Sequence, residues 1–205
     1  SPSPSYTGPI WLQTYYVNQL HSINDLRSWL ANCQIDTDFW GEGNAKNVDN
    51  LWEEYAGGEI HFKDNPPRRE VAVVQIFICR NRQLLIEAEQ ELENGRRRFR
   101  NQPPSEKIKP GETYLQAATR CLQEELGLPV SAISFLPGTY LCRQETTDSL
   151  SYPGLLTEYT FHSIRAQVEG LPDEEFWVEN TAVQSGDPVV RHLWVWRYGR
   201  SICQS

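Results

Sequence analysis

Two stretches in the N-terminal third of the chain carry hydrophobic residues at helical spacing. Residues 22–33 begin with a capping box formed by Ser22 and Asp25, and their apolar side chains then recur every three or four positions. Residues 48–55 repeat this period until Gly57 ends it. The pattern predicts two short amphipathic helices.

A continuous apolar run at residues 71–79 is rich in β-branched side chains, which is typical of a strand buried on both faces. Asn81-Arg82 can turn this run into a second apolar run at residues 84–88, so we expect a hairpin. Asn94-Gly95 is a further turn signal. Shorter runs with strand composition complete a predicted mixed sheet: residues 133–135, 139–143, 156–161, 164–168, 176–178 and 192–196.

The clearest helix signal spans residues 113–127. Thr113 and Gln116 fit a capping box, and Gly127 is the expected stop. On a helical net, one stripe of this helix is apolar and is expected to face the core, while the carboxylates lie elsewhere. The apolar stripe comprises Leu115, Ala118, Leu122 and Leu126, and the residues away from it are Cys121, Glu124 and Glu125.

The stretch from Glu106 to Leu128 resembles the Nudix box, G-x5-E-x7-R-E-U-x-E-E-x-G-U, in which U is a bulky aliphatic residue. The spacing contains no insertion or deletion. Glu106 stands where the family has its first glycine, and Cys121 stands where it has the glutamate that follows the arginine. The matching positions are Glu112, Arg120, Leu122, Glu124, Glu125, Gly127 and Leu128.

The resemblance implies a Nudix-like α/β/α sandwich with a mixed sheet. The small helical N-terminal module ahead of it is predicted by the helical periodicity and is not part of the Nudix pattern. In the family, carboxylates of the box helix hold divalent metal ions that bridge a diphosphate while water attacks phosphorus. Glu124 and Glu125 are therefore the expected catalytic and metal-binding residues, with Glu106 as a candidate third ligand. An ordinary amphipathic helix with a solvated acidic face is the alternative, and the spaced matches argue against it.

Two box positions are expected to be structural, and a third bears on whether the chain is active. Glu112 and Arg120 resemble the family's structural salt bridge, so we assign them a scaffolding role. Mg²⁺ and Mn²⁺, the cofactors expected of an active enzyme, prefer hard oxygen ligands, whereas the thiol of Cys121 is a soft ligand that suits zinc. Cys121 therefore argues for reduced or lost activity.

Two functions follow from these observations. The first is metal-dependent hydrolysis of a nucleoside diphosphate linked to another moiety, since the acidic pair and the spacing are kept. The second is a catalytically inactive Nudix-fold protein that binds or regulates, acting through a small nucleotide or diphosphate ligand or through a protein partner.

Three further residues are candidates for substrate binding. Arg98 and Arg100 lie in a basic run just before the box, where they could contact phosphate or belong to a solvated loop. Tyr152 lies in a loop that could stack on a base or form ordinary surface. Nothing in the sequence pairs His192 with a nucleophile, so a Ser/His/Asp or Cys/His mechanism has no support.

The chain divides in composition into four expected segments. They are a flexible arm at residues 1–9, a helical module at 10–63, a Nudix-like domain at 69–198 and a tail at 199–205. The helical module is rich in tryptophan and tyrosine. These side chains are expected to pack in a core, and a surface for a protein partner or for self-association is the alternative.

Net charge and cysteine usage narrow the setting of the protein. A formal net charge of −8 argues against a nucleic-acid partner, and no apolar run is long enough to span a bilayer. The five cysteines show no paired spacing, which predicts no disulfide framework and a reducing compartment, cytoplasmic or in an organelle. The sequence contains no methionine, so we expect a processed N-terminus.

Overall fold

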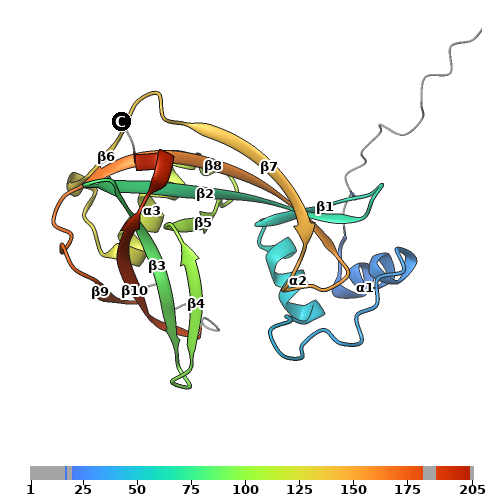
Figure 1. Cartoon of the computed structure of the whole chain (residues 1–205). Coiled ribbons are helices and arrows are strands. Elements are labelled where there is room, and N and C mark those ends of the chain that lie inside the picture. Colours follow the sequence, from blue (N-terminus) through green and yellow to red (C-terminus); the bar gives the residue numbers. More distant parts are fainter. Residues whose placement is uncertain (1–16, 18–19, 182–187, 204–205) are drawn as a thin grey trace, which may run out of the picture. The chain divides into compact units, whose positions relative to one another are not determined.

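The computed structural model describes residue 17, residues 20–181 and residues 188–203 (Figure 1). The chain forms two compact units, one of residues 1–71 and 145–159 and the other of residues 72–144 and 160–205. The first unit thus includes a segment that the sequence analysis placed in the Nudix-like domain. The predicted arm of residues 1–9 lies outside the described residues.

The two predicted N-terminal helices are confirmed as α1 (Ile23–Asn32) and α2 (Val48–Ala56). In α1 the Ser22 hydroxyl accepts a hydrogen bond from the Asp25 N–H at 3.2 Å, and the Asp25 carboxylate accepts one from the Ser22 N–H at 3.1 Å. Asn47 makes the equivalent cap of α2. The apolar faces are fully enclosed at Leu26, Leu30 and Leu51.

The described aromatic residues of the first unit pack against one another. The rings of Trp29 and Tyr55 lie 4.8 and 5.3 Å from the ring of Phe62, which belongs to β1 (Ile60–Lys63). This arrangement favours the core interpretation of the helical module. Phe39, which is 70% exposed, departs from it. Trp11, Tyr15 and Tyr16 lie outside the described residues.

Tyr152 is not a surface residue, and this corrects its interpretation as a base-stacking candidate. Its side chain is completely buried, its hydroxyl donates to Glu54 Oε2 at 2.9 Å, and its ring lies 5.3 Å from that of Trp40. The guanidinium of Arg69 lies 5.1 Å from the same ring. The loop carrying Tyr152 folds into the first unit, so the residue supports a core instead of a ligand.

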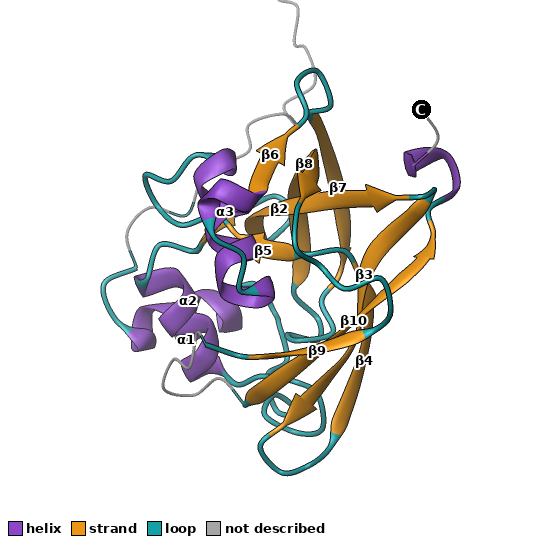
Figure 2. Ribbon diagram, turned by 90° about the vertical axis from the view of Figure 1, so that its left-hand side faces the viewer, coloured by secondary structure: helices purple, strands orange, loops and turns teal. Residues whose placement is uncertain are grey.

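Ten strands among the described residues are joined by hydrogen bonds, in a mixed sheet whose main path is β6-β8-β2-β3-β10-β9 (Figure 2). β1 and β5 pair with β2, β4 pairs with β3, and β7 pairs with β8. The predicted α/β fold class with a helical N-terminal part is confirmed. The strands besides β1 are β2 (Arg68–Arg80), β3 (Gln83–Leu92), β4 (Arg97–Gln102), β5 (Ser105–Lys107), β6 (Ile133–Phe135), β7 (Leu141–Asp148), β8 (Leu156–Val168), β9 (Phe176–Glu179) and β10 (Val189–Tyr198).

The hairpin between β2 and β3 turns where the sequence predicts. Asn81 and Arg82 have φ angles of 51° and 62°, and Cys79 pairs with Leu84 on either side of them. Two successive positive φ angles are the geometry of a tight hairpin turn that matches strand twist. The turn sets the register in which β3 presents its side chains.

Helix α3 (Tyr114–Leu126) packs into the core of the second unit, beside the short helix η1 (Val130–Ala132). Its buried face differs from the predicted stripe. Leu115 is 37% exposed, whereas Cys121 is completely buried in the apolar cluster with Leu122. The prediction that Cys121 lies away from the core was wrong, because the helix buries a wider sector than one stripe.

Cys79 and Cys203 form a disulfide, which corrects the expectation of unpaired cysteines. Cys203 belongs to the short helix η2 (Arg200–Cys203), which the fold brings to the end of β2. The two residues are 124 positions apart, so spacing could not reveal the pair. Cysteine usage therefore no longer argues for a reducing compartment. No described helix is long and apolar enough to cross a membrane.

Candidate active site

Helix α3 is fixed at both ends by the residues that predicted it. The Thr113 hydroxyl accepts a hydrogen bond from the backbone N–H of Gln116 at 3.1 Å, and the side-chain oxygen Oε1 of Gln116 accepts one from the backbone N–H of Thr113 at 2.9 Å. Gly127 ends the helix at a φ of 66°, a left-handed conformation that favours glycine. The helix therefore presents its polar side chains from a defined start and stop.

Arg120 ties the loop before α3 to the helix. Its Nε and Nη2 donate to the two carboxylate oxygens of Glu112 at 2.9 and 3.0 Å, and Nη2 also donates to the Lys107 carbonyl at 2.9 Å. These hydrogen bonds hold the pKa of Glu112 below its ordinary value and raise the pKa of Arg120. The expected scaffold pair is thus in contact.

The remaining nitrogen of Arg120 lies between two candidate metal ligands. Nη1 is 3.8 Å from Glu106 Oε2 and 3.5 Å from Glu124 Oε2. Glu106 lies on strand β5, opposite Val74 of β2, in a strand that the sequence analysis did not predict. Burial raises the pKa of Glu106 despite the nearby arginine. Strand β5 and helix α3 therefore bring Glu106 and Glu124 to one arginine.

Glu125 lies in the most acidic part of the site. Burial, followed by the negative charges of Glu87 and Glu106, raises its pKa well above the ordinary range, while Arg100 acts in the opposite direction. Cys121 forms a hydrogen bond with the Glu125 side chain. Glu125 is therefore close to a second carboxylate, Glu87, that no sequence motif had indicated.

The two candidate arginines lie on β4 and are held by residues of β3. Arg98 Nε donates to Gln90 Oε1 at 3.0 Å, and Arg100 Nε donates to Glu87 Oε1 at 3.3 Å. Glu87 also contacts the ring of His192 on β10. Arg98 and Arg100 thus belong to a polar network on the sheet, and Gln90, Glu87 and His192 are members that sequence reasoning missed.

A model of the NUDIX domain matches residues 66–190, which is more than half of the chain. The chain belongs to the Nudix family. A search of curated proteins found no match. Residues 145–159 of the first unit, which include Tyr152, fall inside the matched range, whereas α1 and α2 precede it.

Several solved Nudix structures resemble the chain distantly. A NUDIX hydrolase from Nitrosomonas europaea is 20% identical over 62% of this chain and 72% of its own, with a TM-score of 0.38. A MutT NUDIX hydrolase from Burkholderia pseudomallei is 19% identical over 63% and 83%, with a TM-score of 0.34. An Ap4A hydrolase from C. elegans is 15% identical over 62% and 80%, with a TM-score of 0.36.

Where Nudix enzymes have a glutamate, this chain has a thiol that is not available to a metal ion. The Cys121 side chain is completely buried, and burial together with the charges of Glu125 and Glu106 raises the pKa of its thiol well above the ordinary value. A protonated, enclosed thiol is not a ligand for Mg²⁺ or Mn²⁺. Any divalent ion must rely on the carboxylates around it.

Those carboxylates fit a divalent ion in their chemistry. Glu106, Glu124 and Glu125 offer hard oxygens. Burial and then the charges of Glu87 and Glu106 raise the pKa of Glu125, and a bound cation would offset those charges. Across the described ranges, however, no three His, Cys, Asp or Glu side chains are already arranged to hold a metal ion. The donors are present, but they have not converged.

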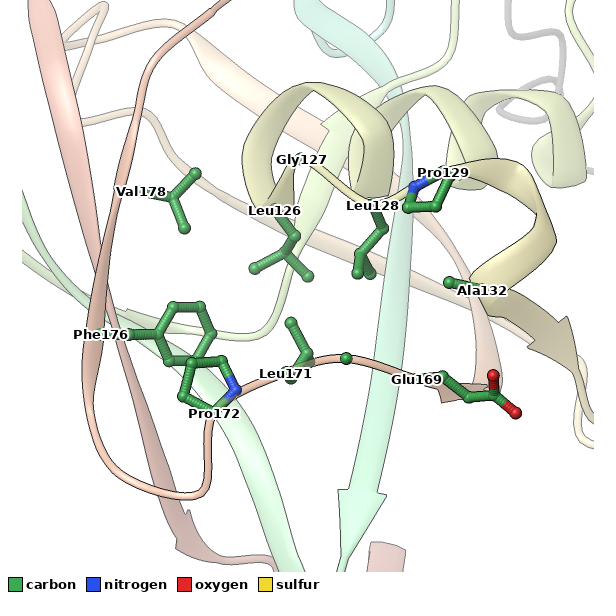
Figure 3. Close-up of a pocket in the computed structure, with 11 residues that line it drawn as sticks. Leu126, Gly127, Leu128, Pro129, Ala132, Glu169, Leu171, Pro172, Phe176 and Val178 are labelled. Atoms are coloured by element: carbon green, nitrogen blue, oxygen red, sulfur yellow. The ribbon is translucent and has the colours of Figure 1, made fainter.

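One pocket of the second unit is separate from these carboxylates. It has a volume of about 530 Å³ and lies at the end of α3, where Leu126 and Leu128 face Leu171 and Phe176 (Figure 3). Its lining is mainly apolar, with Glu169 at one side. None of the predicted site residues lines it, so we assign no part of the Nudix chemistry to it.

Replacing Glu112 with glutamine is expected to lower the free energy of unfolding by about 1–3 kcal/mol, because hydrogen bonds to a charged partner are lost. The pKa of Glu112 is lowered, so its contribution is present above an unfolded pKa of about 4.3 and is lost as the pH falls through the folded pKa. Urea unfolding of wild type and Glu112→Gln at pH 7 and pH 3 should therefore show a difference that shrinks in acid. Glu174→Gln, at an exposed carboxylate, is the matched control.

Glu125→Gln is expected to behave in the opposite way. Its raised pKa means that the folded state favours the protonated acid, so stability falls as the pH rises above the unfolded pKa of about 4.3. Without metal at pH 7.5 the variant should therefore melt higher than wild type, by about 2–4 °C for each kcal/mol recovered. Added Mn²⁺ should raise the melting temperature of wild type more than that of the variant. A metal shift of equal size in both proteins would count against Glu125 as a ligand.

Proposed function

We propose that the chain is a divalent-metal-dependent hydrolase of a nucleoside diphosphate linked to another moiety. The observation that carries the proposal is that Arg120 Nη1 lies 3.8 Å from Glu106 and 3.5 Å from Glu124. Glu125 directly follows Glu124 on α3. Membership of the Nudix family supports the reaction class. The small ligand would be a nucleotide or another diphosphate.

Glu106, Glu124 and Glu125 would hold Mg²⁺ or Mn²⁺. Such an ion supplies charge neutralisation at the diphosphate and activation of a water molecule. The chain's own residues keep these carboxylates in place, because the ion pair between Arg120 and Glu112 ties the loop to the helix.

A second candidate function is ligand binding without hydrolysis, and the burial of Cys121 favours it. The thiol replaces one carboxylate of the box and points into the apolar core. Arg120 also neutralises Glu106 and Glu124 directly, so these side chains are not dependent on a metal for a counterion. In this view the protein binds a nucleotide or a partner and leaves the diphosphate intact. The internal packing of the described aromatic residues in the first unit offers no support for a partner or for self-association through that unit.

The deciding experiment is a turnover screen against ADP-ribose, dinucleotides, nucleoside triphosphates and dinucleoside polyphosphates in Mg²⁺ and in Mn²⁺. Hydrolysis of the phosphoric anhydride by wild type, reduced at least 100-fold in Glu124→Gln and Glu125→Gln, is expected, because several kcal/mol of barrier depend on metal ligands. Glu174→Gln should keep full activity. No turnover by folded wild type on any of these substrates would favour the binding function.

Cys121→Glu tests the degenerate position. A carboxylate at this enclosed site beside Glu125 should lower the melting temperature in EDTA, because a buried unpaired charge costs about 3–5 kcal/mol. Mn²⁺ should recover much of that loss and raise turnover above wild type. Cys121→Ser, which keeps the size and adds no charge, is the control. If Mn²⁺ stabilises Cys121→Glu no more than Cys121→Ser, position 121 does not belong to the metal site.

A further inference from the structure

A β-bulge in β3 turns two polar side chains to the same face of the sheet. Toward β10 the register passes from Leu193 opposite Glu89 to Trp194 opposite Glu87, so Ala88 of β3 is the extra residue between the pairs. Toward β4 the register shifts at the same place, from Glu87 opposite Gln102 to Glu89 opposite Phe99, but there the extra residue lies in β4. Residues three apart on a regular strand point to opposite faces, yet Glu87 and Gln90 are both buried and hydrogen-bonded at 3.1 Å. Bulges commonly re-aim side chains next to active sites.

The buried pair continues across the sheet to β10. His192 lies opposite Gln90 in the register and contacts the Glu87 carboxylate, and both His192 and Glu87 are only 5% exposed (strands in Figure 1). Placing ionisable groups inside a sheet rarely adds stability, because desolvation offsets the attraction between the charges. A buried acid and imidazole beside a site instead indicate a functional arrangement.

The same two β3 residues each hold one arginine of β4. Gln90 Oε1 accepts from Arg98 Nε at 3.0 Å, and Glu87 Oε1 accepts from Arg100 Nε at 3.3 Å. Glu87 and Gln90 are hydrogen-bonded to each other, so the two arginines that they hold lie on the same face of the sheet.

Glu87 is two residues from Leu85 on β3, and His192 is two residues from Trp194 on β10. Leu85 and Trp194 belong to the apolar cluster that also contains the buried face of α3. The two guanidiniums therefore lie on the side of the sheet that faces the box helix.

We propose that Glu87, Gln90 and His192 are positioning residues that hold Arg98 and Arg100 as a clamp for the two phosphates of the substrate. The inference rests on the proposed function for its ligand class, a diphosphate. A hydrogen bond at Nε fixes the plane of a guanidinium group, and guanidinium groups bind phosphate oxygens in a bidentate manner. Fixing the arginines before the ligand arrives lowers the entropy lost on binding. His192 acts at one remove, by orienting the carboxylate that holds Arg100.

The clamp is tested by calorimetric titration of α,β-methylene-ADP in EDTA, where neither metal binding nor turnover takes part. Arg98→Ala and Arg100→Ala should each weaken binding about tenfold or more, because a hydrogen bond to a charged group is lost. Arg97→Ala removes the same charge from the opposite face of β4, where Arg97 pairs with Glu89 and lies against Trp177, and should bind as wild type does.

The positioning role is separated from a merely structural one by a double-mutant cycle. Gln90→Leu removes the acceptor of Arg98 without changing the net charge, and should weaken binding about threefold to tenfold. In the Arg98→Ala background the same substitution should have no further effect. Likewise His192→Gln, which keeps a donor toward Glu87, should bind better than His192→Leu. Equal effects of Gln90→Leu in both backgrounds would overturn the positioning role.

Folding defects are kept apart from binding defects by thermal unfolding of each variant. If Gln90→Leu does not fold, Arg98→Lys replaces it, because lysine keeps the charge but loses the fork, and the same loss of affinity is expected. The proposed function can fail independently: methylene-ADP binding that depends on Arg98 and Arg100, with no turnover, leaves the clamp intact. Turnover together with unchanged binding by the arginine variants, or no binding by wild type, overturns the clamp.

Discussion

The double hydrogen bond between Arg120 and Glu112 is the interaction on which the site depends. It joins a side chain in the middle of α3 to the loop that precedes the helix, and a third bond reaches the Lys107 carbonyl next to Glu106. Strand β5, loop and helix are thereby one rigid piece. Without it, Glu106 and Glu124 would sit on elements free to move apart, since β5 is only three residues long.

The site is built from charges that resist being together. Burial and then the charges of Glu87 and Glu106 raise the pKa of Glu125, while Arg100 acts in the opposite direction. Burial with the charge of Glu124 raises the pKa of Glu106, while Arg120 acts in the opposite direction. Such an arrangement weakens the fold locally, as expected where binding or catalysis needs an unsatisfied charge. The thiol of Cys121 moderates this tension, because it occupies a core position that would otherwise carry a further acid.

Local chemistry made much of the fold readable from the sequence. Thr113 with Gln116, and Asn81 with Arg82, act on their own neighbours, so their effects survive without knowledge of distant partners. The burial of Cys121, the burial of Tyr152 and the strand that contains Glu106 could not be predicted in this way. Each of them depends on contacts with residues that are distant in the sequence. The bulge between Glu87 and Glu89 is also a pairing property, and no residue type signals it. Because pairing with β4 and β10 brings Glu87, Gln90 and His192 together, the sequence alone did not reveal this cluster.

The disulfide between Cys79 and Cys203 closes a covalent ring around most of the Nudix domain, including α3, β4 and β10. An unfolded chain that keeps this ring cannot expand as a linear chain can, so it remains more compact and exposes less new surface to denaturant. The slope of unfolding free energy against urea concentration would then differ between the oxidised and the reduced protein, even where the native structures are the same. The redox state of two cysteines far from the carboxylates thus determines how the denatured ensemble is populated, and with it the apparent cooperativity of the fold that carries the site.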